Sequence, residues 1–135
     1  DKKEISKILT ENNIDFSSVK WCDDAFIINN ANEEDLRQLS IYEDGKIYLQ
    51  SLSSMLPPIV LEPKPDEDIL DMAAAPGGKT TQIAALTNNQ AHITACELNN
   101  IRAEKLYREA CDLFYLKNYD ALIYGINLAK VEYVE

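Results

Sequence analysis

The chain has 135 residues, of which 46% are hydrophobic and 27% charged, an ordinary balance for a globular protein of about one domain. Thirteen basic residues against 23 acidic ones give a formal net charge of -10, which excludes tight capture of a phosphate backbone by the charge of this chain alone. No stretch is apolar enough to predict a membrane span or a secretory signal, so we expect a soluble protein of the cytoplasm.

The first 44 residues predict a small α/β segment. Apolar side chains at helical spacing between residues 5 and 9 predict a helix. Short apolar runs on either side of Asp23-Asp24 predict a hairpin around these two acids. The acidic run at 33–35 predicts the start of a second helix that carries Leu36 and Leu39.

A connecting region follows. Residues 51–56 predict a short helix that ends at Pro57-Pro58, because proline cannot continue a helix and constrains the residue before it. The run Pro63-Lys64-Pro65-Asp66 predicts a rigid connector.

Strands and helices alternate beyond this connector. A strand over 69–73, a glycine loop, a helix over 79–86 and a second strand over 92–97 succeed one another. This alternation is typical of a parallel, doubly wound α/β sheet. The sequence then predicts a helix with one buried face over 103–113 and a buried strand over 119–124.

The glycine loop at residues 73–80 is the most informative segment. The adjacent Gly77 and Gly78 let the backbone approach a ligand closely, and the N–H groups of the next helix favour a nucleotide-like or carboxylate-bearing ligand. The segment also satisfies a relaxed phosphate-loop pattern, in which Lys79 contacts phosphates and Thr80 holds magnesium. Pro76 would stiffen such a loop, and a nucleotide hydrolase remains the less favoured alternative.

Glu97 favours an adenosine-type cofactor instead. It lies at the end of the second strand, about twenty residues past the glycines, where an acid can accept hydrogen bonds from both hydroxyls of a ribose. The sequence therefore predicts a cofactor across the carboxyl ends of the two strands.

Cysteine and histidine give no sign of a metal or a disulfide. The cysteines at 22, 96 and 111 are widely spaced, form no CxxC pair and are odd in number, and His92 is the only histidine. Neither structural zinc nor a disulfide framework has the residues it needs here. We expect no metal site.

Three blocks of sequence carry a resemblance to a known family. The blocks are GKIYLQSLSSMLPP at residues 45–58, DMAAAPGGKT at residues 71–80, and Glu97 with Asn100 and Arg102. In this order and spacing they resemble the Sun/Nop family of RNA cytosine-5 methyltransferases. The resemblance implies an incomplete class I, Rossmann-like α/β methyltransferase core with a mostly parallel sheet at 45–135, preceded by the small α/β accessory segment at 1–44.

The resemblance also implies a cofactor, a substrate and a site. It implies S-adenosylmethionine, with the glycine loop against the methionine portion and Glu97 at the ribose, and an RNA substrate, either ribosomal or transfer RNA. The residues expected in the cofactor site are Ala73, Ala74, Ala75, Pro76, Gly77, Gly78, Lys79, Glu97 and Arg102.

The catalytic step is where the chain departs from the family. Family members attack carbon 6 of cytosine with a cysteine thiolate and release the product with a second cysteine, in a Pro-Cys and a Thr-Cys motif. Here the three cysteines follow Trp21, Ala95 and Ala110, so the catalytic nucleophile is unknown. A truncated chain, closed-up gaps or a degenerate protein would explain the departure; we expect an incomplete enzyme, and a non-catalytic cofactor-binding or RNA-binding module is the alternative.

Overall fold

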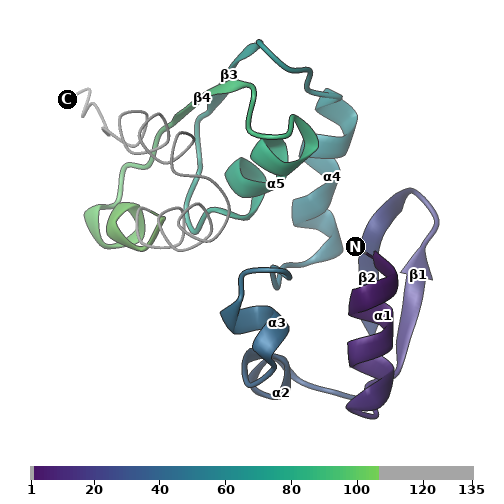
Figure 1. The fold of residues 1–135 in the computed structure, drawn as a ribbon. Coiled ribbons are helices and arrows are strands. Elements are labelled where there is room, and N and C mark those ends of the chain that lie inside the picture. The colour runs from purple at the N-terminus through teal and green to yellow at the C-terminus, as the bar shows by residue number, and fades with distance from the viewer. Residues whose placement is uncertain (1, 107–135) are drawn as a thin grey trace. The chain divides into compact units, whose positions relative to one another are not determined.

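The computed structural model describes residues 2–106 and divides the chain into two compact units, Asp1–Tyr48 and Leu49–Glu135 (Figure 1). The strand predicted at 119–124 and the end of the helix predicted before it lie outside the described residues. None of the helices within residues 2–106 has the length and apolar character needed to cross a bilayer.

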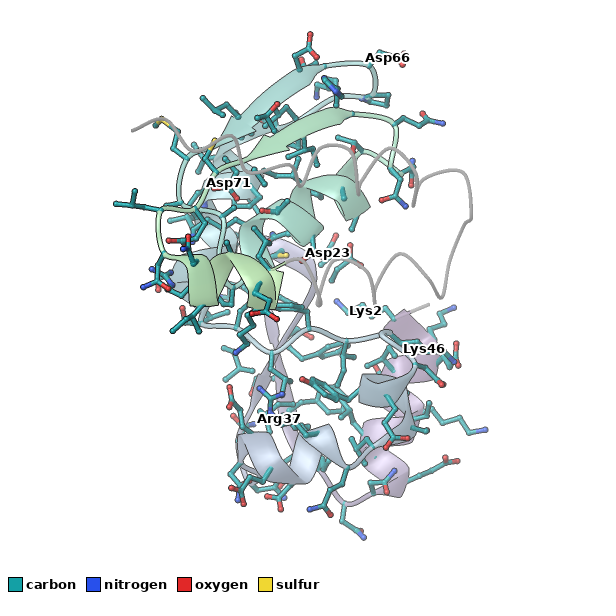
Figure 2. The ribbon with its side chains drawn as sticks, turned by 90° about the vertical axis from the view of Figure 1, so that its left-hand side faces the viewer. Lys2, Asp23, Arg37, Lys46, Asp66 and Asp71 are labelled. Carbon is teal, nitrogen blue, oxygen red and sulfur yellow. The ribbon has the colours of Figure 1, made fainter. Side chains whose placement is uncertain are left out.

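The first unit begins with a helix and a hairpin. The elements are α1 (Lys2–Glu11), β1 (Phe16–Val19) and β2 (Cys22–Ile28). Helix α1 buries Ile5 and Leu9, as its spacing predicts, and β1 pairs antiparallel with β2. Lys2 lies over the ring of Phe26 and donates a hydrogen bond to the carbonyl of Asp23, so α1 contacts the hairpin (Figure 2).

The hairpin forms as predicted, but its turn was placed wrongly. The chain turns at Lys20 and Trp21, and Asp23-Asp24 lies inside β2. The pairing jumps from Ser18 opposite Phe26 to Val19 opposite Cys22, so the acids are left out of the regular ladder. Both acids are exposed, because an irregularity in the ladder lets successive polar residues face solvent.

The predicted second helix is two short helices. Asn32 caps α2 (Glu33–Arg37): its side chain accepts hydrogen bonds from the N–H groups of Glu34 and Asp35, and the Asp35 carboxylate accepts one from the Asn32 N–H at 2.9 Å. This capping box fixes the start that the acidic run predicts. Helix α2 ends before Leu39, which takes an extended conformation and begins α3 (Ser40–Glu43).

An exposed ion pair joins Glu4 to Lys46 in the first unit. Lys46 Nζ lies 2.8 Å from Glu4 Oε1 (Figure 2 labels Lys46). This hydrogen bond, and next the attraction between the two charges, lowers the pKa of Glu4 and raises the pKa of Lys46. The stability gained from the lowered pKa of Glu4 is therefore present above the unfolded pKa of this residue, and it is lost as the pH falls through the folded pKa. The stability gained from the raised pKa of Lys46 is present below the unfolded pKa of the lysine, and it is lost as the pH rises through the folded pKa.

We expect the Glu4→Gln variant to be slightly less stable than wild type at neutral pH and low salt. The difference should shrink in acid, where Glu4 becomes protonated, and again in strong alkali, where Lys46 loses its charge. Urea unfolding at several pH values measures the difference, and 1 M salt should reduce it because both side chains are exposed. A difference that does not change between neutral and acid pH would contradict the assigned pair.

The second unit contains the predicted parallel strands. Its labelled elements are α4 (Leu52–Leu61), β3 (Asp68–Asp71), α5 (Gly78–Leu86) and β4 (His92–Ala95). Strand β3 runs parallel to β4, with Ile69 opposite Ile93, and α5 connects them (Figure 1). Ile83 and Ala84 of α5 pack against Ile93. The strand–helix–strand alternation is thus confirmed, with strands two residues shorter at their carboxyl ends than predicted.

The prediction that Pro57-Pro58 ends the preceding helix was wrong. Helix α4 continues through both prolines to Leu61 and ends at Glu62 in the left-handed conformation. Its packing compensates for the lost backbone bonds: α4 lies beside α5 (Figure 1), Pro58 is fully buried, and Gln82 of α5 donates a hydrogen bond to the Met55 carbonyl at 3.1 Å.

Candidate functional site

The site is built at the carboxyl ends of β3 and β4. Asp71 ends β3, and its carbonyl accepts a hydrogen bond from the Cys96 N–H at 2.8 Å. The Ala74 N–H in turn donates to the Cys96 carbonyl at 3.0 Å. These two bonds continue the parallel ladder past both strands, so the glycine loop starts beside the residues that follow β4.

Two alanines seat the loop against the sheet. Ala74 and Ala75 are buried in one small cluster with Ala95 and Leu106. Because three of these four side chains are single methyl groups, the loop backbone lies close to the end of the sheet. Ala73 and Pro76, by contrast, are exposed, and the Ala75-Pro76 peptide is cis.

Gly77 turns the loop into α5. Its φ of 125° and ψ of -10° lie in a region that a residue with a Cβ atom avoids. Within residues 2–106 no side chain caps α5, whose first residue is Gly78, so its first N–H groups can donate to a ligand. Lys79 stands in this first turn, half-buried, and makes no hydrogen bond or ion pair with any residue in the described part of the chain. Free N–H groups and an unpaired lysine together favour an anionic group at this end of α5.

Glu97 follows β4 by two residues and is buried, with 8% of its surface exposed. One carboxylate oxygen, Oε1, accepts a hydrogen bond from the Asn99 N–H at 3.0 Å. The other, Oε2, lies 3.6 Å from Nη2 of Arg102. A buried carboxylate held in this way has a fixed orientation, and its remaining lone pairs can accept further hydrogen bonds.

Arg102 joins the two halves of the site. Its Nη2 also donates to the carbonyl of Ala75 at 2.8 Å, so one guanidinium contacts both the glycine loop and Glu97. Asn99 positions this arginine: its side chain accepts from the Arg102 N–H at 3.1 Å and caps the helical segment at residues 100–106. The glycine loop, Glu97 and Arg102, which sequence reasoning grouped together, therefore meet.

Sequence reasoning missed two contributors. Thr80 donates its hydroxyl proton to Asp71 Oδ2 at 2.7 Å, and Asn99 caps the helix that carries Arg102. Asn99 had a visible signal, an Asn three residues before Arg102 at the start of a helical pattern. The Thr80 contact had none, because it depends on how far α5 is rotated over β3.

The contact of Thr80 also bears on the phosphate-loop alternative. The hydroxyl that would hold magnesium is engaged with Asp71. Among residues 2–106 no three side chains of His, Cys, Asp or Glu gather as a metal-binding group.

Comparison with known sequences identifies relatives. Residues 58–124 match the family described as 16S rRNA methyltransferase RsmB/F. Ribosomal RNA small subunit methyltransferase F of Shewanella loihica is 39% identical over 119 residues, which cover 82% of this chain and 24% of that protein. The tRNA (cytosine(49)-C(5))-methyltransferase of Pyrococcus abyssi is 42% identical over 104 residues, which cover 77% of this chain and 33% of that protein. The chain thus spans about a quarter of the length of the first relative and about a third of the length of the second.

Solved structures confirm the α/β methyltransferase fold. A methyltransferase homolog protein from Pyrococcus horikoshii superposes with a TM-score of 0.74 at 32% identity, covering 84% of this chain and 37% of that one. NSun6 from Pyrococcus horikoshii, solved with SFG, an analogue of S-adenosylmethionine, superposes with a TM-score of 0.55 at 45% identity, covering 61% of this chain and 21% of that one.

Proposed function

We propose that this chain carries the S-adenosylmethionine site of an RNA cytosine-5 methyltransferase, because residues 58–124 match the family described as 16S rRNA methyltransferase RsmB/F. The observation that carries the proposal is the position of Arg102, whose guanidinium contacts the Ala75 carbonyl and lies 3.6 Å from Glu97. One cofactor molecule can then lie across the glycine loop and the buried acid.

Each part of the site has a chemical task. The N–H groups at the start of α5 attract the carboxylate of the methionine portion, together with Lys79, which pairs with no other residue in the described part of the chain. Glu97 accepts hydrogen bonds from the two ribose hydroxyls. The buried alanines and Gly77 allow the cofactor to lie against the backbone. Arg102 keeps the glycine loop at a fixed distance from Glu97.

The names of the relatives support RNA as the substrate of the whole protein. When bound, S-adenosylmethionine supplies the methyl group for carbon 5 of cytosine, and that carbon becomes nucleophilic only after a thiolate has attacked carbon 6. Cys22 is buried in the first unit. Cys96 follows Ala95, so it lies in neither a Pro-Cys nor a Thr-Cys motif. The described residues therefore bind and orient the cofactor, and the nucleophile remains unassigned.

The absence of both cysteine motifs from the sequence favours one second candidate, a cofactor-binding or RNA-binding module of the same fold without catalysis. Incubation of this chain with labelled S-adenosylmethionine and ribosomal RNA distinguishes the two. Cofactor binding without methyl transfer would support the module, and transfer would require a nucleophile outside the two motifs.

Calorimetric titration tests the proposed cofactor. We expect S-adenosylhomocysteine to bind without magnesium, because N–H groups, a lysine and a buried acid can hold its carboxylate and ribose hydroxyls directly. ATP with magnesium should give no measurable heat at the same concentrations. Binding of ATP or GTP that depends on magnesium, with no binding of S-adenosylhomocysteine, would contradict the proposal and restore the phosphate-loop alternative.

A further inference from the structure

Thr80 links the first turn of α5 to the last residue of β3. Its hydroxyl donates to Asp71 Oδ2 at 2.7 Å, and both side chains are half-buried. The other oxygen, Oδ1, accepts from the N–H of Ala73 at 3.2 Å (Figure 2 labels Asp71). The Asp71 carboxylate thus contacts the first residue of the glycine loop and the helix into which the loop leads.

The rest of the loop is held mainly through its backbone. The Ala74 N–H donates to Cys96, the Ala75 carbonyl accepts from Arg102, and the Gly77 carbonyl accepts from the Thr81 N–H at 2.8 Å. None of these bonds fixes the distance between β3 and the start of α5. The hydrogen bond between Thr80 and Asp71 fixes this distance, because it joins the residue before the loop to the helix after it.

The hydrogen bond between Thr80 and Asp71 matters for binding because the loop must present its N–H groups to the ligand in one geometry. Gly77 gives the loop backbone freedom that binding would otherwise have to remove, and a site fixed in advance binds its ligand more tightly. The Asp71 carboxylate also needs a fixed direction. A carboxylate free to rotate beside an uncapped helix start would compete with the ligand for the same N–H groups.

We propose that Thr80 is a positioning residue, which holds the glycine loop in its ligand-binding conformation by fixing Asp71. The part of this inference that concerns cofactor affinity rests on the proposed function. The part that concerns the order of the loop does not, since it needs no ligand.

Three variants of the full chain test the inference. Thr80→Val removes the hydroxyl at nearly constant shape, and Thr80→Ser keeps it. Thr81→Val is the matched control: it makes the same change one residue later, where the hydroxyl donates to the carbonyls of Gly77 and Gly78, one turn back, and to no residue of β3. Affinity for S-adenosylhomocysteine is measured by calorimetry. Hydrogen exchange is measured in the ligand-free protein at the hydrogen-bonded amides of Ala73, Ala74 and Thr81.

For Thr80→Val we expect about tenfold weaker binding and about tenfold faster exchange in the loop, the size of one hydrogen bond to a charged group. Thr80→Ser and Thr81→Val should stay within about twofold of wild type in both measurements. Unchanged loop exchange in Thr80→Val would overturn the inference, and so would equal effects of Thr80→Val and Thr81→Val. If wild type failed to bind S-adenosylhomocysteine while Thr80→Val still accelerated loop exchange, the proposed function would fall and the positioning role of Thr80 would stand.

Discussion

Replacing Glu97 with alanine is expected to weaken binding of S-adenosylhomocysteine about 10- to 150-fold, which corresponds to the loss of about 1.5–3 kcal/mol in hydrogen bonds to a charged group. The carboxylate is buried at the end of the second parallel strand, and Asn99 and Arg102 hold its orientation. Its loss removes the proposed acceptor for two ribose hydroxyls. Calorimetric titration of wild type and variant measures the change.

The control for Glu97 is the Gln variant, which keeps an acceptor oxygen and loses the charge. It should fall between wild type and Glu97→Ala in affinity. Because the carboxylate also accepts the Asn99 N–H, thermal unfolding of both variants must show that the second unit is still folded. Unchanged affinity in a folded Glu97→Ala variant would mean that the ribose does not lie at this acid.

Replacing Gly77 with alanine should both destabilise the second unit and weaken ligand binding. At a φ of 125° and a ψ of -10°, a Cβ atom meets the backbone, and we expect a loss of about 1–3 kcal/mol in the free energy of unfolding. Relief of that strain would move the loop, so affinity for S-adenosylhomocysteine should fall at least about tenfold. Urea unfolding and calorimetry measure the two effects.

Gly78→Ala is the matched control for the effect on stability. Gly78 begins α5 and is not among the described residues with positive φ, so alanine fits its backbone. We expect the free energy of unfolding to change by less than about 1 kcal/mol, since alanine is the better helix former. Equal destabilisation by the two alanines would show that burial of the loop, rather than the conformation of Gly77, determines the cost.

The core of the site could be predicted because its signals are local. Strand, glycine loop, helix and strand each carry their own pattern, and parallel strands joined by a helix must end on the same edge. At that edge the structure brings the glycine loop and Glu97 together. Nη2 of Arg102, which contacts the loop, lies 3.6 Å from Oε2 of Glu97. The resemblance to known methyltransferases added the identity of the cofactor, which the pattern alone left open between two ligand classes.

The errors arose where packing between distant segments outweighed a local rule. Pro57-Pro58 should end an isolated helix, yet burial of Pro58 and the bond from Gln82 keep α4 intact. Asp23-Asp24 has the polarity of a turn, yet an irregular ladder lets both acids face solvent within β2. The hydrogen bond between Thr80 and Asp71 spans nine residues, and no repeat in the sequence signals such a contact.

The most direct test of the central claim is to map bound S-adenosylhomocysteine on the isotope-labelled protein by its effect on amide chemical shifts. We expect the largest changes at Gly77, Gly78 and Glu97, which lie at both strand ends, and we expect these changes to saturate together in one binding event. Changes confined to residues of the Asp1–Tyr48 unit, or changes in the loop without any at Glu97, would contradict a cofactor that lies across the two strand ends.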